Sequence, residues 1–189
     1  MGTDHETVWF SEVIEDYTFI VMGSETDSVQ ATISDEQIDW VKEQLALARA
    51  RNDNPIFIIN HQPMSGTHHS PDNRHEDCFT DSARSAKLQA ALDEYENVFY
   101  FSGHQHNGLN TGMLDHPQGY KSVEKVGKNI TSVNLPSFQF GNLKNGGYVF
   151  AGTGIVMDVY EDRIELTGRN FELSDNILGF KVSIDLTQQ

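Results

Sequence analysis

The sequence contains two segments, at positions 56–59 and 98–101, in which apolar residues follow one another without alternating with polar ones. Such runs are typical of strands that are covered on both faces of a sheet. A segment with helical spacing precedes each run, and parallel strands need crossover helices of this kind to connect them. These two segments constrain the fold most strongly, and they predict an α/β protein with parallel strands at its centre.

Local signals place the other elements of the first half. Residues 7–13 and 17–22 are predicted to form a hairpin that turns at Glu15 and Asp16. A helix is expected from Ser34 to about position 51, because Ser34 and Gln37 have the pattern of a capping box and apolar residues then recur at helical spacing. A second helix is expected over 81–95.

The second half follows a different pattern. A long polar loop is expected from about 107 to 128, followed by strands near 130–134, 148–151, 155–160 and 164–167 and by an edge strand near 180–186. Ile155, Met157 and Val159 occupy alternate positions of their segment, as they would in a half-buried antiparallel strand. The sequence therefore predicts a mixed sheet followed by antiparallel C-terminal strands.

Charge and composition narrow the possible partners. The formal net charge of −15 argues against a nucleic-acid backbone or an anionic membrane as partner. We find no signal peptide and no apolar run near the roughly 18 residues that a membrane span needs. The single cysteine, Cys78, excludes an internal disulfide. The cytoplasm is the default expectation, and export of a longer parent protein is the alternative.

Histidine follows both apolar segments. His61 comes directly after Asn60 at the end of the first, and His104 and His106 follow the second in a His-x-His pattern. Ligands bind at the carboxyl ends of strands in open α/β sheets, and imidazole is the commonest metal-binding side chain. Alternate residues of an extended segment point the same way, so His104 and His106 can face one cavity. These three residues are the candidate metal ligands, whereas His5, His75 and His116 are interpreted as structural or surface residues.

These residues carry a family resemblance. Asn60-His61-Gln62-Pro63 and Gly103-His104-Gln105-His106 resemble the last two metal-binding motifs of the calcineurin-like metallophosphoesterases, in the motif order of the purple acid phosphatases. Residues 17–24 are similar to the strand that follows that family's Gly-Asn-His motif. The resemblance implies a four-layer α-β-β-α sandwich, present here in part. Residues 1–170 would be the C-terminal portion of the phosphoesterase domain, and 171–189 an extension or edge strand.

The resemblance also implies a chemistry. His61 and His104 would bind the second ion of a dinuclear centre and His106 the first, with Mn, Fe or Zn as the divalent metal. A metal-bridging hydroxide would then hydrolyse a phosphomonoester or phosphodiester substrate. In the loop after His61, His69 is the candidate for protonating a leaving group and His68 for holding phosphate oxygens. The alternative for both is a solvated polar loop.

Three motifs that precede these in the family have no counterpart. The chain contains no Asp-x-His, no Gly-Asp pair and no Gly-Asn-His. The expectation is therefore a fragment that lacks the N-terminal metal motifs and that associates, either with itself or with a complementary N-terminal half, because missing strands leave an open edge. Two other functions stay open: an inactive metal- or partner-binding module, and a mononuclear hydrolase that uses three histidines.

Overall fold

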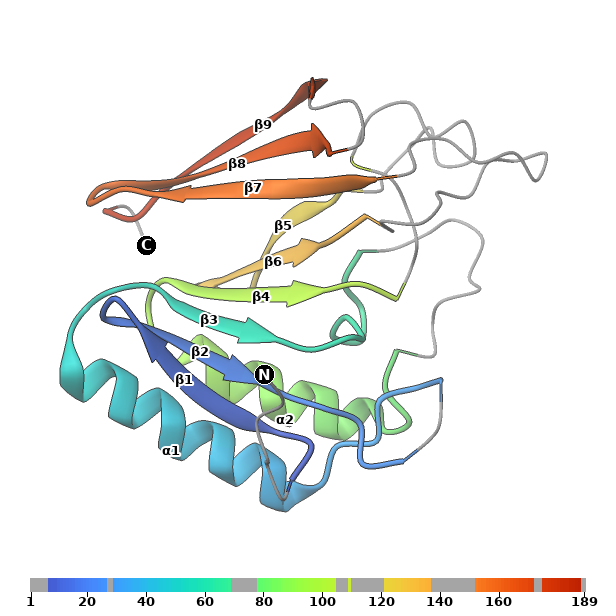
Figure 1. Ribbon diagram of the computed structural model, residues 1–189. Helices are drawn as coiled ribbons and strands as arrows, with labels where there is room; N and C mark the ends of the chain where they lie inside the picture. Colours follow the sequence, from blue (N-terminus) through green and yellow to red (C-terminus); the bar gives the residue numbers. More distant parts are fainter. Residues whose placement is uncertain are drawn as a thin grey trace.

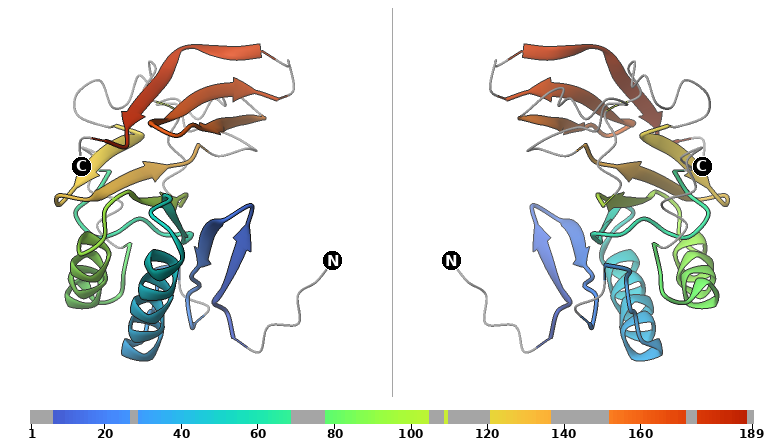
Figure 2. Two further views of the ribbon diagram at one scale, coloured as in Figure 1. Left: turned by 90° about the vertical axis from the view of Figure 1, so that its left-hand side faces the viewer. Right: turned by 90° about the vertical axis from the view of Figure 1, so that its right-hand side faces the viewer.

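The computed structural model describes residues 7–26, 29–68, 78–104, 109, 121–136, 152–171 and 175–187. Two helices, α1 (Asp35–Arg51) and α2 (Ser82–Asp93), cover one face of a six-stranded sheet. A three-stranded sheet packs on the opposite face, so the described part has three layers (Figures 1 and 2). This arrangement confirms the predicted α/β class and is consistent with a partial α-β-β-α sandwich.

The larger sheet is mixed. Its strands are β1 (Phe10–Ile14), β2 (Tyr17–Val21), β3 (Ile56–Ile59), β4 (Val98–Ser102), β5 (Val123–Val126) and β6 (Ile130–Asn134), in the order β1-β2-β3-β4-β6-β5. The four central strands pair in parallel, and β1 and β5 add antiparallel edges. The apolar segments at 56–59 and 98–101 are thus the neighbouring central strands β3 and β4, as predicted.

Strand β5 was not expected, because it lies inside the segment predicted as a polar loop. It has only four residues, and two of them, Glu124 and Lys125, are charged. Short, charged strands are typical of sheet edges, where they discourage pairing with other chains. A hydrophobicity pattern does not identify such a strand. The strand predicted at 148–151 lies outside the described residues.

The smaller sheet is antiparallel and consists of β7 (Thr153–Val159), β8 (Arg163–Asn170) and β9 (Asp175–Asp185). Side chains on its inner face, among them Ile164, Leu166 and Phe180, pack against Phe57 and Phe99 of the larger sheet. Its outer face is polar: the Glu165 carboxylate lies 3.0 Å from both the Arg163 Nε and the Lys181 Nζ. A polar face can remain in water without a covering layer.

The cap of α1 differs from the predicted capping box. The Ser34 hydroxyl accepts a hydrogen bond from the Gln37 backbone N–H at 3.1 Å, as expected. The Gln37 side chain, however, does not return to Ser34. Its amide donates to the Gly23 carbonyl and to the Glu25 carboxylate, which also accepts the Ser34 N–H. Gln37 is fully buried, so it ties the end of β2 to the helix.

The three-stranded sheet does not cover the whole inner face of the larger sheet. Strand pairing places Ile14, Tyr17, Phe19 and Ile59 on the face that carries Phe57. Of these four residues, which we call the inner-face strip, Ile14 is 58% exposed and Ile59 is 38% exposed. Two apolar side chains on the inner face of the larger sheet, Ile14 and Ile59, are therefore in contact with water.

Neither helix has the length and apolar character of a membrane span, since α1 has 17 residues and α2 has 12; this finding concerns the described residues.

Candidate metal centre at the ends of β3 and β4

The candidate centre lies where two parallel strands end side by side. His61 follows β3 by two positions, and His104 follows β4 by two positions. The ring centroids of the two imidazoles are 5.4 Å apart, and the rings meet edge to face at 85°. His61 is exposed and His104 is partly exposed, so a ligand from solvent can reach both. The structure therefore brings these two predicted residues together.

Backbone hydrogen bonds continue the pairing of β3 and β4 beyond their ends. The Asn60 N–H donates to the Phe101 carbonyl at 3.1 Å, and the Gly103 N–H donates to the His61 carbonyl at 2.9 Å. The two histidines are thus held in register by the same ladder that joins the strands. A Cβ atom added to Gly103 would lie 3.7 Å from His61 Nδ1, which is an ordinary contact, so His61 alone does not require glycine at this position.

Two buried polar side chains, Tyr100 and Asn60, fix the backbone next to His61. The Tyr100 hydroxyl donates to the Gln62 carbonyl at 2.8 Å, and the Asn60 side-chain amide donates to the same carbonyl and to the Tyr100 oxygen. Burial raises the pKa of Tyr100, so its hydroxyl keeps the proton that it donates. The residues on both sides of His61 are therefore fixed by hydrogen bonds in the interior. Nothing in the sequence pattern around Tyr100 indicated this role.

Asn134 supports the other histidine. It ends β6 and is 1% exposed. Its side-chain amide donates to the Gly103 carbonyl at 2.5 Å and to the Ser102 hydroxyl at 3.1 Å. Asn134 therefore holds the turn that carries His104. The sequence shows only that a polar residue ends this strand. The residues that Asn134 contacts are known only from the tertiary structure.

The backbone of His104 has an unusual conformation. Its φ angle is +68°, in the left-handed region that residues other than glycine adopt uncommonly. Residues in such conformations cost free energy and persist only where the surrounding structure maintains them. Here the hydrogen bonds to Gly103 are part of that surrounding structure.

His68 lies in a different environment from the pair. It is fully buried, its Nδ1 is 2.8 Å from the Lys121 carbonyl, and its Nε2 is 2.8 Å from the Ser132 hydroxyl. Since a carbonyl only accepts, Nδ1 carries the proton. The His68 backbone N–H donates to the Glu124 carboxylate at 2.7 Å. Contact with a phosphate would require the ring to give up these partners, so the predicted substrate role has no support in this geometry.

The other predicted site residues, His69 and His106, lie outside the described residues, and their roles stay predictions. The imidazoles of His61 and His104 can supply two of the four ligands that a zinc site commonly has. Within the described ranges, no group of three or more His, Cys, Asp or Glu side chains could hold a metal ion. The described donors therefore fit part of a metal centre.

The fold is similar to that of a known phosphatase. The chain superposes on a solved purple acid phosphatase, PPD1 from yellow lupin (Lupinus luteus) seeds, with a TM-score of 0.59 and 14% sequence identity. The match covers 98% of this chain and 34% of the lupin chain, so this chain spans about a third of that protein's length. No protein-family model and no curated protein sequence matches the chain. The similarity thus concerns the fold.

The environment of His68 predicts a dependence of stability on pH. Burial lowers the pKa of the His68 imidazole below its usual value, although the Lys121 carbonyl and the Glu124 carboxylate act in the opposite direction. The unfolded chain therefore binds this proton at a higher pH than the folded chain does. The free energy of unfolding should fall as the pH is lowered below about 6.5, until the folded-state pKa is reached.

Urea unfolding between about pH 8 and pH 5 would measure this dependence. We expect the slope below about pH 6.5 to be smaller in a His68→Gln variant, even if that variant is less stable at every pH. An unchanged slope in the variant would contradict the assignment to His68.

The left-handed backbone at position 104 predicts a specific difference between two substitutions. His104→Gly should be more stable than His104→Ala by about 1 kcal/mol, because glycine adopts a positive φ without steric cost. The same pair of substitutions at His61, which has no positive φ, should show the opposite order. Denaturant unfolding of the four variants measures both differences. Equal stabilities of the two position-104 variants would show that the turn is not strained.

Proposed function

We propose that this chain contributes the C-terminal part of a metal-dependent phosphoesterase, and that His61 and His104 bind one divalent cation. The observation that carries the proposal is the 5.4 Å separation of the two imidazoles at the ends of β3 and β4. Ligands bind at this edge of open α/β sheets. The similarity of fold to a purple acid phosphatase supports the same reaction class.

A bound divalent cation would supply Lewis-acid stabilisation of the negative charge on the phosphoryl oxygens. The chain's own residues determine where that cation and the substrate meet. His61 and His104 would hold the ion from two strands, and the Tyr100 and Asn134 hydrogen bonds would keep the ligands in place. We assign His106 to the first ion of the dinuclear centre, the ion that His61 and His104 do not bind, and His69 to proton transfer to the leaving group. Nitrogen ligands are compatible with manganese, iron and zinc.

A second candidate function is a binding module without catalytic activity. The observation that favours it is the scarcity of ligands: in the described ranges, no carboxylate joins the two histidines in a group that could hold a metal. Two adjacent cations repel each other strongly unless a negative ligand lies between them. In this case the chain would bind a metal weakly, or a partner, without hydrolysing a phosphate ester.

We also propose that the chain is completed by another polypeptide surface, either a second copy or a complementary chain. The inner-face strip leaves Ile14 58% exposed and Ile59 38% exposed on the side of the sheet that is otherwise a core. Apolar side chains that stay exposed on an otherwise packed sheet face are a place where another surface could bind. The lupin phosphatase has about two-thirds of its chain beyond the matched part, which is consistent with a missing complement.

Metal titration and hydrolysis test the first proposal. We expect Zn²⁺ or Mn²⁺ binding, measured by calorimetry, to weaken about tenfold or more in His61→Ala and in His104→Ala, because each variant loses one ligand. His104→Ala should also abolish hydrolysis of an aryl phosphodiester while the helical circular dichroism stays unchanged. His5→Ala is the matched control and should behave as the unmodified chain. Metal binding without hydrolysis would favour the inactive module, and unchanged binding in both variants would exclude the proposed centre.

Light scattering tests the completion of the inner face by a second copy. At micromolar concentration we expect a mass above that of one chain, and a monomer when Ile14→Asp and Ile59→Asp are combined, because buried carboxylates oppose association. Val29→Asp is the control, since Val29 is 76% exposed and lies outside the strip. If the unmodified chain is strictly monomeric, self-association is excluded and the complementary chain is the remaining partner.

A further inference from the structure

The outer edge of β7 carries backbone groups that are available for pairing. Within the described ranges, β7 pairs with β8 alone. The Tyr160 N–H donates to the Arg163 carbonyl, and the Phe171 N–H donates to the Gly152 carbonyl. Because hydrogen-bonded positions alternate along an antiparallel pair, the even-numbered residues of β7 bond to β8. The odd-numbered residues from 155 to 159 point their N–H and C=O groups away from β8. They are Ile155, Met157 and Val159.

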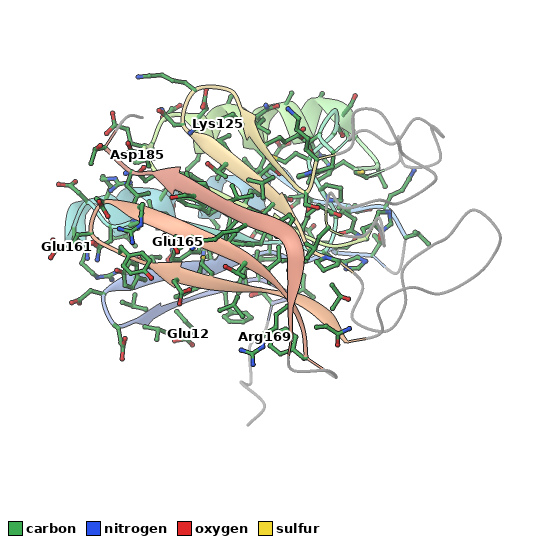
Figure 3. All side chains as sticks on the ribbon, turned by 90° about the horizontal axis from the view of Figure 1, so that it is seen from above. Glu12, Lys125, Glu161, Glu165, Arg169 and Asp185 are labelled. Carbon is green, nitrogen blue, oxygen red and sulfur yellow. The ribbon has the colours of Figure 1, made fainter. Side chains whose placement is uncertain are left out.

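This edge faces the uncovered part of the larger sheet. Val159, at the end of β7, and Tyr17, at the start of β2, line one cavity of about 560 Å³. The end of β9 lies beside β4 instead, since the Asn97 side chain donates to the Leu186 carbonyl. Strand β7 is therefore the strand of the smaller sheet that lies nearest to β1. In the view from above, Glu12 of β1 lies beyond β7, on the side away from β8 (Figure 3).

A strand added to this edge would lie over the inner-face strip. Neighbouring strands are about 4.8 Å apart and packed sheets about 10 Å apart, so a strand beside β7 would run above β1 and β2. The inner face of β1 leaves Ile14 58% exposed. Available backbone groups on one sheet and exposed apolar side chains on the facing sheet are separate observations, and one extended segment satisfies both. Every second side chain of that segment would be apolar and would face the strip.

Two carboxylates border this surface. Asp158 is exposed on the outer face of β7, and Glu12 is exposed on the inner face of β1. Neither forms an ion pair within the described part of the chain. The nearby cations of the outer face, Arg163 and Lys181, contact Glu165 instead. Lysine or arginine on the added segment would therefore complement the charge of this edge.

A second copy of the chain does not match the β7 edge. Its net charge is also −15, and pairing of two β7 strands would bring a second Asp158 to the same place. The second copy would also carry its own β1 and β2 below the joined strands, where β1 of the first copy already extends beyond β7 (Figure 3). A single extended segment has no sheet below it. Self-association by face-to-face packing on the strip, without strand pairing, is a separate case.

We propose that the β7 edge binds an extended cationic segment of another polypeptide as a fourth strand of the smaller sheet. Apolar side chains at alternate positions would cover the inner-face strip, and lysine or arginine side chains would approach Asp158 and Glu12. This inference rests on the proposal that another polypeptide completes the inner face, and it specifies the chemistry of that polypeptide. The metal centre has no part in it.

The experiment adds a strand-forming peptide, acetyl-Lys-Val-Thr-Val-Lys-Val-Thr-Val-Lys-amide, to the full chain. NMR titration measures binding, and hydrogen exchange measures which amides become protected. We expect slower exchange at Ile155, Met157 and Val159, and no binding of the same peptide with glutamate in place of lysine. Absence of binding, or binding without protection at these three amides, overturns the proposal. The light-scattering result for the strip would be unaffected, so failure of strand pairing is distinguishable from failure of the completion proposal.

A proline substitution tests the strand pairing itself. Met157→Pro removes an N–H that points away from β8, so the ladder to β8 is retained. Met157→Ala keeps this N–H and is the matched comparison. Met157→Pro should bind the peptide about fivefold more weakly than Met157→Ala, because one edge hydrogen bond is lost. Equal affinities would overturn the proposal, as would a dimer of the unmodified chain that Met157→Pro converts to a monomer, since the occupant would then be a second copy.

Charge variants separate this edge from general electrostatic attraction. Glu12→Gln combined with Asp158→Asn should weaken binding of the lysine peptide about fivefold, because two exposed charge pairs are lost. Glu36→Gln combined with Glu43→Gln makes the same change in net charge on α1 and should leave the affinity nearly unchanged. Equal losses in the two double variants would show attraction by net charge alone and would overturn the proposal.

Discussion

The parallel pairing of β3 with β4 is the interaction on which the rest of the structure depends. Ile56, Phe57 and Ile58 of β3 and Val98 and Phe99 of β4 are at most 1% exposed. Both faces of this pair are therefore covered, one by the helices and the other by the three-stranded sheet. Because the backbone ladder continues past the last strand residues, it also determines where His61 and His104 lie. The core and the candidate centre thus share one set of hydrogen bonds.

The polar groups around the candidate centre show how a site can be kept rigid at the edge of an apolar core. Tyr100 belongs to a covered strand, yet its hydroxyl reaches the backbone beside His61. Asn134 does the same for the turn that carries His104. A buried polar group is stable only when it is hydrogen-bonded, so each of these side chains specifies one position of the neighbouring backbone. His68 is fixed in the same way, by hydrogen bonds to Lys121, Glu124 and Ser132.

The two ends of the parallel strands carry different groups. At the carboxyl ends, two imidazoles face solvent and can act as ligands for a cation. At the amino ends, a cavity is lined by residues of five segments, among them Tyr17 and Tyr160. The outer face of the three-stranded sheet is polar and faces water, whereas the inner-face strip is apolar and partly exposed. The larger sheet therefore presents one candidate metal centre and one candidate association surface.

The sequence by itself determined the central architecture. Unbroken apolar runs predicted β3 and β4 as parallel strands. Helical spacing and the Ser34 cap predicted α1 and α2, because these signals are local. The same runs pointed to His61 and His104, since each histidine directly follows a strand. Only the tertiary structure decided the rest. The Gln37 side chain bonds to the end of β2 instead of Ser34, and β5 forms within a polar segment. Tyr100 and Asn134 support the candidate centre, because their hydrogen-bond partners lie far away along the chain and become neighbours only when the strands pair.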